Sequence, residues 1–230
     1  TTTTGDTTTK TTTSKKLCMF LRSFGVNPAV ISMDDYFVER EETPLNEEGK
    51  PDYECLEAVD LKLFDNQIEK ILKGEEVVTP TYNFLTGNKE YNNKIKLGNS
   101  DVLVIEGIHA LDKRVLTNIS KNKIFRIYIS ALTELNIDNH NYISTTDNRL
   151  LRRIIRDNKT RGHGVQKTIS TWPDVRSGEE KYIFPYQDNA DYTFNSALIY
   201  EIGVLKTYAE PLLYAVDPSD SCYEEAKRLI

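Results

Sequence analysis

A dense group of arginines between residues 149 and 161 is the first feature of the chain that could do chemistry. Four of them recur every three or four residues and would share one broad face of a helix: Arg149, Arg152, Arg153 and Arg156. Asp157 is the only acid within 149–157. Guanidinium groups match phosphate oxygens in shape and charge, and a cluster of them repels itself unless it meets anions. This stretch is therefore predicted to bind phosphate.

Acidic residues follow two short apolar runs. Asp34 and Asp35 come after the run 29–32, and Glu106 ends the run 102–105. A carboxylate at a strand end can hold Mg²⁺ through water or accept a proton from a substrate hydroxyl. The second arrangement is that of a Walker B acid. For the first pair, an aspartate that caps the following turn remains an equal alternative.

The threonine-rich start contains part of a second phosphate-binding pattern. Lys10, Thr11 and Thr12 precede an amphipathic segment, like the end of the Walker A motif G-x-x-x-x-G-K-[ST]. However, Thr9 occupies the place of the second glycine, and Gly5 lies one residue too close to the lysine. A β-branched residue rarely adopts the positive φ that glycine allows. We therefore expect an incomplete first strand and phosphate loop at 1–13.

Strands and helices alternate along the chain and must position these residues. Apolar periodicity predicts helices from about 14 to 24, 56–72, 146–158 and 197–215, and strands at 29–32, 102–105, 124–129 and 192–194. A polar hairpin or loop is expected at 82–98, and loops at 38–55 and 159–187. This alternation is typical of a doubly wound parallel sheet. In such sheets the active site lies beyond the carboxyl ends of the strands.

Composition excludes several classes of protein. The formal net charge of −6 argues against general nucleic-acid binding, although a local basic cluster can still bind a small anion. The three cysteines are far apart and have no metal-ligand spacing. No apolar run of about 18 residues and no signal peptide is visible. We expect a soluble, cytoplasmic protein without a nucleic-acid or membrane partner. The sequence shows no coiled-coil pattern and does not decide whether the chain forms a homo-oligomer.

Taken together, these motifs resemble the uridine kinase and phosphoribulokinase branch of P-loop kinases, most closely its bacterial uridine kinase-like members. The resemblance runs from about residue 10 to 216 and rests on five segments: 31–37 (ISMDDYF), 80–84 (PTYNF), 105–108 (IEGI), 152–157 (RRIIRD) and 178–185 (GEEKYIFP). It implies an α/β fold, a P-loop NTPase-type doubly wound parallel sheet flanked by helices. A single domain spanning 1–230 would carry an arginine-rich lid at about 149–187 and a substrate-side hairpin at about 82–98.

The resemblance also implies an activity and roles for individual residues. It implies an ATP-dependent kinase that uses Mg²⁺ and phosphorylates the 5′-hydroxyl of uridine, cytidine or a related nucleoside. Asp34 matches the acid that accepts the hydroxyl proton, and Glu106 and Thr11 match metal-binding positions. Other matching positions bind ATP (Lys10, Thr11, Thr12 and Arg152), clamp the phosphates or the ribose side (Arg153, Arg156 and Arg161) or form the substrate site (Glu54, Tyr82, Phe84 and His163).

Three departures from the family pattern leave the acceptor open. Glu54 stands where an aspartate reads the ribose hydroxyls, His163 replaces a lid arginine, and Gly87-Asn88 replaces a base-reading histidine. A kinase of the same branch for another hydroxyl compound, such as a sugar phosphate, is one alternative. A catalytically weak nucleotide-binding module is another, because the Walker A loop is degenerate. A further explanation is that residues 1–13 are not the natural sequence.

Overall fold

The computed structural model describes residues 2–3, 7–46, 49–84, 86–133, 136, 138–140 and 142–230, with backbone only at 2–3, 7–10 and 160–161. The chain forms two compact units. The first contains Thr1–Ile129 and Gly178–Phe194, and the second contains Ser130–Ser177 and Asn195–Ile230. Each unit is described by itself.

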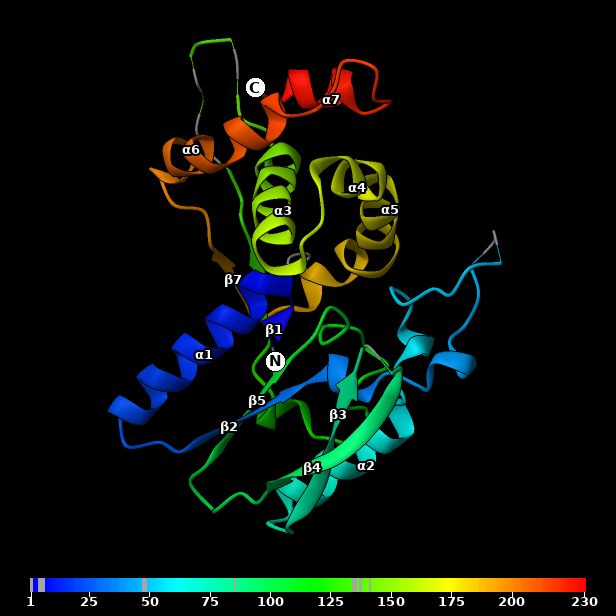
Figure 1. The fold of residues 1–230 in the computed structure, drawn as a ribbon. Helices are drawn as coiled ribbons and strands as arrows, with labels where there is room; N and C mark the ends of the chain where they lie inside the picture. The colour runs from blue at the N-terminus through cyan, green and yellow to red at the C-terminus, as the bar shows by residue number, and fades with distance from the viewer. Residues whose placement is uncertain are drawn as a thin grey trace. The chain divides into compact units, whose positions relative to one another are not determined.

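A five-stranded sheet with the order β2-β5-β1-β6-β7 forms the centre of the first unit (Figure 1). Its strands are β1 (Thr2–Thr3), β2 (Pro28–Ser32), β5 (Val102–Glu106), β6 (Ile127–Ser130) and β7 (Tyr192–Asn195). The pairs β2–β5, β1–β5 and β1–β6 are parallel, as predicted. Nothing in the threonine-rich start predicts β1, because two flanking strands, rather than apolar side chains of its own, hold it in place.

Helix α1 (Thr7–Ser23) follows β1 and begins about seven residues earlier than its apolar pattern predicts. It packs on β1, β2 and β5. Ser14 and Cys18 are buried on this side, whereas Phe20 and Phe24 are 65% and 82% exposed. The expected apolar face is therefore wrong for the two phenylalanines. Short side chains one helical turn apart let the helix approach the sheet closely.

The predicted helix at 56–72 is two elements, the 3₁₀ turn η3 (Leu56–Ala58) and helix α2 (Leu61–Leu72). The break occurs because the side chain of Asp60 caps α2, accepting the Leu63 N–H at 3.0 Å. Phe64, Ile68 and Ile71 of α2 are fully buried in the main core of the first unit.

The hairpin consists of antiparallel strands β3 (Val77–Asn83) and β4 (Asn88–Ile95). It begins five residues before the predicted segment. The first strand is half apolar and packs against α2 and against the 3₁₀ turn η1 (Met33–Tyr36). The polar side chains that indicated a hairpin belong mainly to β4, which is mostly exposed.

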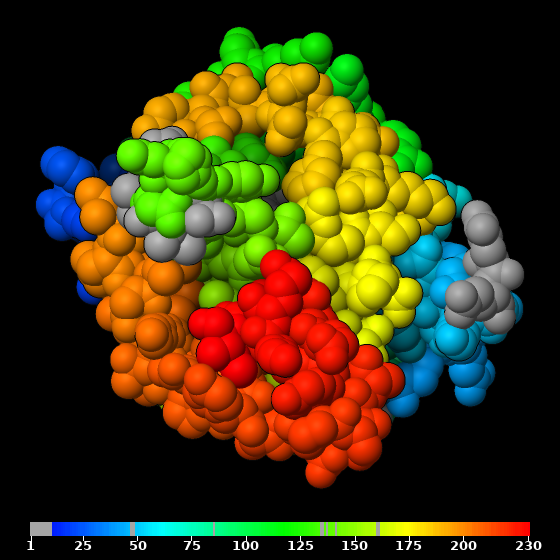
Figure 2. Space-filling view, turned by 90° about the horizontal axis from the view of Figure 1, so that it is seen from above, coloured from blue at the N-terminus to red at the C-terminus, as the bar shows by residue number. Residues whose placement is uncertain are grey.

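The second unit is helical and consists of α3 (Thr145–Arg161), α4 (Val165–Ser170), the first part of α5 (Trp172–Tyr182), α6 (Glu201–Tyr214) and α7 (Tyr223–Arg228). Figure 2 shows α6 (orange) and α7 (red) next to each other on one face. Gly162 ends α3 with a left-handed φ of +64°. In the part of the chain that is described, no helix combines the length and apolar composition needed to cross a bilayer.

The loop predicted at 159–187 is wrong, since α4 and α5 occupy most of it. Val165, Ile169 and Trp172 lie at positions i, i+4 and i+7 and contact the helical core of the second unit. Only three large apolar side chains mark this face, and the surrounding glycines and charges hide the period in the sequence.

Candidate active site

The carboxyl ends of β2 and β5 meet at one edge of the sheet, where Ser32 is paired with Glu106. The residues that directly follow the two strands, Met33 after β2 and Gly107 after β5, lie in close contact. A Cβ added to Gly107 would lie 2.7 Å from Cβ of Met33, closer than side-chain atoms approach. Glycine at this position therefore lets the turn that carries Asp34 lie directly against the end of β5.

Thr11 and Glu106, the two predicted metal-binding residues, are in contact. The Thr11 hydroxyl donates a hydrogen bond to Oε1 of Glu106 at 3.1 Å, although 95 positions separate them. Glu106 is 3% exposed. The contact places the Walker A-like hydroxyl and the Walker B-like carboxylate at one point beside the Asp34 turn.

This pair fits Mg²⁺ in the manner of phosphate-transferring enzymes. Hydroxyl and carboxylate oxygens are ligands that Mg²⁺ prefers, and it usually takes one or two of them together with waters and substrate phosphates. Among the described residues, no group of three or more His, Cys, Asp or Glu side chains could hold a metal ion. The donor set therefore suits a metal held jointly with a nucleotide, not a cage made by protein alone.

Asp34 lies on a turn whose next two residues are fastened to other elements. Oδ1 of Asp35 accepts the backbone N–H of Tyr82 at 3.2 Å. The hydroxyl of the fully buried Tyr36 donates to Oε1 of Gln67 in α2 at 2.8 Å. Burial raises the pKa of Tyr36 far above its usual value, so this donor stays protonated. Asp34 itself is half-buried on this fixed turn.

An aromatic cluster adjoins the turn and contains both predicted substrate-contacting rings. Tyr82 and Phe84 lie edge-to-face with centroids 5.1 Å apart, and Phe37 contacts them at 5.7 and 6.2 Å. Tyr53 contacts Phe37 at 6.2 Å. Phe84 is 61% exposed, so the cluster presents ring surface to a ligand.

The hydroxyl of Tyr82 is a polar group inside this cluster. The residue is 4% exposed, and its Oη has no hydrogen-bond partner among the described residues. Burial raises the pKa of Tyr82, so the hydroxyl remains a donor at neutral pH. A ligand that supplies an acceptor here would remove the cost of this unsatisfied group.

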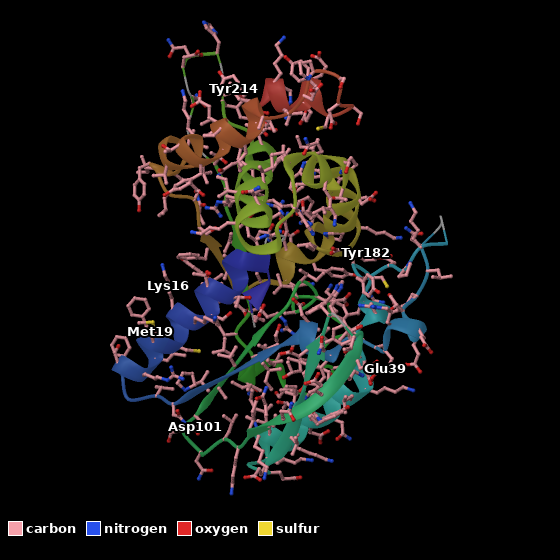
Figure 3. The ribbon with its side chains drawn as sticks, in the orientation of Figure 1. Lys16, Met19, Glu39, Asp101, Tyr182 and Tyr214 are labelled. Carbon is pink, nitrogen blue, oxygen red and sulfur yellow. The ribbon has the colours of Figure 1, made fainter. Side chains whose placement is uncertain are left out.

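The predicted substrate residue Glu54 is exposed and packs over the segment that begins at Gly178. A Cβ on Gly178 would lie 3.3 Å from Cβ of Glu54. Beside it, Asp52 accepts the Glu54 N–H at 2.9 Å and the hydroxyl of Tyr182 at 3.3 Å; Tyr182 is labelled in Figure 3. Asp52 therefore links Glu54 to Tyr182, and the sequence analysis selected neither Asp52 nor Tyr182. Their only sequence signal was the GEEKYIFP segment, which contains Tyr182.

The arginines of α3 have carboxylate partners in their own unit. Arg152 forms hydrogen bonds with both carboxylate oxygens of Glu201, one of them at 2.6 Å, and donates to the Ser196 carbonyl at 3.1 Å. Arg156 donates to Asp157 at 2.8 and 2.9 Å, and Arg153 lies 3.5 Å from the same residue. The sequence analysis expected Asp157 to be the only acid beside these arginines. The structure corrects this, because Glu201 of α6 is a second one.

The remaining predicted residues are placed only in part. The side chains of Lys10 and Arg161 lie outside the described residues, as does the whole of Gly5. Thr12 is exposed on α1. His163 is half-buried, and its Nε2 lies 3.1 Å from Nζ of Lys167.

Comparison with known proteins gives the family. Residues 2–202 match the model described as "Phosphoribulokinase / Uridine kinase family". The uridine kinase of Staphylococcus haemolyticus (strain JCSC1435) is 27% identical over 184 residues, 79% of each chain. Similar solved structures include one described as a possible uridine kinase from Bacillus stearothermophilus (TM-score 0.52, 20% identity, 84% of this chain and 85% of the other). Another is a D-glycerate 3-kinase from Cryptococcus neoformans var. grubii (TM-score 0.50, 12% identity, 83% and 79%).

The two structural likenesses concern the fold, and the family match spans most of the sequence, including both candidate metal ligands and the arginine helix. The chain belongs to the phosphoribulokinase and uridine kinase family of P-loop kinases.

Proposed function

We propose that this protein transfers the γ-phosphate of ATP to the 5′-hydroxyl of uridine, cytidine or a related nucleoside. The observation that carries the proposal is the contact between the hydroxyl of Thr11 and the carboxylate of Glu106, beside the turn that holds Asp34. Phosphoryl transfer needs a nucleotide-phosphate site, charge neutralisation and one base. These residues can provide all three.

Asp34 is the proposed general base. Its carboxylate takes the proton from the acceptor hydroxyl as that oxygen bonds to the γ-phosphorus, while the bond from phosphorus to the β–γ bridging oxygen breaks and ADP leaves. Thr11 and Glu106 would hold Mg²⁺, which neutralises phosphate charge when bound. Lys10 is assigned to the β- and γ-phosphates, and Thr12 to the same nucleotide.

Arg153, Arg156 and Arg161 are proposed to bind the charge that develops on the transferred phosphate. Phosphate must compete with Asp157 for the first two of them, because both contact that carboxylate. Arg152 is already paired with Glu201, and this carboxylate offsets the charge that Arg152 could offer to ATP. We therefore expect Arg152 to contribute less than Arg153 and Arg156.

The acceptor is assigned to the aromatic cluster. Phe84 offers exposed ring surface on which a base can stack, and the buried ring of Tyr82 packs edge-to-face against it. Glu54 and His163 are assigned to the ribose side. The similarity to proteins named uridine kinase supports a pyrimidine nucleoside as the first acceptor to test.

A second candidate is a kinase of the same family for another small hydroxyl compound. Glu54, His163 and Gly87-Asn88 differ from the family pattern at positions assigned to the acceptor. A third candidate, a catalytically weak nucleotide-binding module, follows from Thr9 in place of the phosphate-loop glycine.

An acceptor panel separates the three candidates. The protein, with its N-terminus verified by intact mass, is incubated with Mg·ATP and uridine, cytidine, purine nucleosides, glycerate or sugar phosphates, and products are identified by mass spectrometry. A nucleoside 5′-monophosphate is expected. Phosphorylation of a non-nucleoside acceptor alone supports the second candidate. Calorimetric ATP binding without any product supports the third, and absence of both transfer and ATP binding contradicts the proposal.

A further inference from the structure

Asp35, the neighbour of the proposed base, has no role in the reaction described above. Its carboxylate reaches across 47 positions to accept the backbone N–H of Tyr82, at 3.2 Å. The side chain is half-buried and starts from the same 3₁₀ turn as Asp34. The two adjacent carboxylates therefore differ in role: Asp34 is the proposed base, and Asp35 attaches β3 to the turn.

Strand β3 needs such an attachment because its pairing with β4 is interrupted. Thr79 is opposite Asn93 and Pro80 is opposite Tyr91, so one residue of β4 is bulged between them. The bulge lies two residues before Tyr82. The path of β3 into the aromatic cluster is therefore not fixed by its ladder with β4 alone.

A second contact fastens the same strand at its other end. Nε2 of Gln67 donates to the Val78 carbonyl at 3.1 Å, and Oε1 of Gln67 accepts the Tyr36 hydroxyl at 2.8 Å. Asp35 and Tyr36 thus hold β3 on either side of the bulge. Both residues follow directly after Asp34, so the turn that carries the proposed base is also tied to β3, the strand that carries Tyr82.

We infer that Asp35 is a positioning residue, which fixes Tyr82 and the acceptor surface relative to the carboxylate of Asp34. The inference rests on the proposed function in one respect, the assignment of the acceptor to Tyr82 and Phe84. Loss of a hydrogen bond to a charged group corresponds to about a 10- to 100-fold change in an equilibrium constant. Most of that change should fall on acceptor binding.

The kinetic test compares Asp35→Ala, Asp35→Asn and Asp101→Ala. Asp101 is a matched control, because Oδ2 of its side chain also accepts a backbone N–H, that of Gly98 at 2.7 Å, just before β5 (Figure 3). We expect Asp35→Ala to raise the acceptor KM at least about 10-fold and to leave the ATP KM within about 2-fold. Asp35→Asn should restore most of the affinity, since its amide oxygen can accept the same N–H.

Hydrogen exchange at the Tyr82 amide gives a readout that needs no substrate. Exchange should be at least about 10-fold faster in Asp35→Ala than in wild type, and close to wild type in Asp35→Asn and Asp101→Ala. Unchanged exchange at Tyr82 in Asp35→Ala overturns the inference. Faster exchange with an unchanged acceptor KM overturns the positioning role. If the wild-type protein transfers no phosphate, the proposed function fails, and the exchange result still decides whether Asp35 anchors the strand.

Discussion

Two charge-rich regions of the chain, the turn after β2 and helix α3, differ in the groups that hold their side chains. In the turn after β2, Asp35 is held by a backbone N–H and its neighbour Tyr36 by an amide side chain. In α3, the arginines are held by the carboxylates of Asp157 and Glu201. The backbone N–H of Tyr82 and the amide of Gln67 fix the geometry of the turn. The carboxylates in α3 instead neutralise charge that a phosphate would otherwise meet.

The difference has consequences for function. Changes in the turn should act through position, because the frame around Asp34 is set before any ligand binds. Changes in α3 should alter the competition between phosphate and the carboxylates that contact the arginines. They should also alter stability, because one of these carboxylates, Glu201, joins α6 to α3. The predictions below test the two regions separately.

The largest effect is expected from Asp34→Asn, which keeps the size of the side chain and removes its ability to accept a proton. Turnover at saturating ATP and acceptor should fall by about 10²- to 10⁴-fold, the usual contribution of a general base. Both KM values should change little, as measured by steady-state kinetics. Asp101→Asn serves as the control with unchanged turnover. Full activity in Asp34→Asn would remove the base from the proposed mechanism.

In α3, removal of the central carboxylate should cost stability. Asp157 is 2% exposed and contacts Arg153 and Arg156, so Asp157→Ala removes a buried carboxylate from beside two cations and should lower the free energy of unfolding by about 3 kcal/mol. Urea unfolding can be followed by Trp172, the single tryptophan, which packs on the core of this unit.

The exposed pair Lys73–Glu69 is the control for that experiment. Glu69→Ala should change stability much less than Asp157→Ala, because solvent screens an exposed ion pair. An equal loss for both variants would show that the partners of the α3 arginines do not stabilise the second unit.

In the turn, the close approach of Gly107 to Met33 offers a purely steric test. Gly107→Ala should push the turn away from β5 and lower turnover by about 10²-fold, since displacement of about 1 Å at a reacting group has that effect. Gly203→Ala in α6 is the matched control, because an added Cβ there meets nothing within 4 Å. Equal turnover in the two variants, with both folded by circular dichroism, would contradict the fixed turn.

The smallest effect concerns pH and the ion pair between α3 and α7. Hydrogen bonds from Arg228 at 2.7 and 3.0 Å lower the pKa of Asp147. A carboxyl whose pKa is lower in the folded state stabilises the protein above its unfolded pKa of about 3.9 and loses that contribution as pH falls through the folded value. The Tm of wild type should therefore fall more steeply below about pH 4 than that of Asp147→Asn. Parallel profiles from Trp172 fluorescence would exclude this linkage.

Local pattern was sufficient to predict much of the fold. The apolar runs at 29–32 and 102–105 predicted β2 and β5, and the spacing of apolar residues predicted α3, because both signals come from residues close in sequence. The two-residue strand β1 was missed, since only its neighbours hold it. Helices α4 and α5 were missed, because three apolar residues among glycines and charges give a weak period.

The candidate site also has a part that local motifs predict and a part that depends on contacts between distant residues. Motifs were enough to select Thr11, Asp34 and Glu106, because each stands at a fixed place relative to a strand or helix. The partners that hold the site are far away in the sequence, such as Tyr82 for Asp35 and Glu201 for Arg152. No local pattern predicts such contacts, since they exist only once the strands and helices have packed.

Transfer of labelled phosphate tests the central claim most directly. ATP with isotopically labelled oxygens on its γ-phosphorus is incubated with the protein, Mg²⁺ and uridine or cytidine, and the products are analysed by mass spectrometry. The account predicts a nucleoside 5′-monophosphate that carries the labelled oxygens and whose formation is lost in Asp34→Asn. Label recovered only as inorganic phosphate, or only in unreacted ATP, would contradict it.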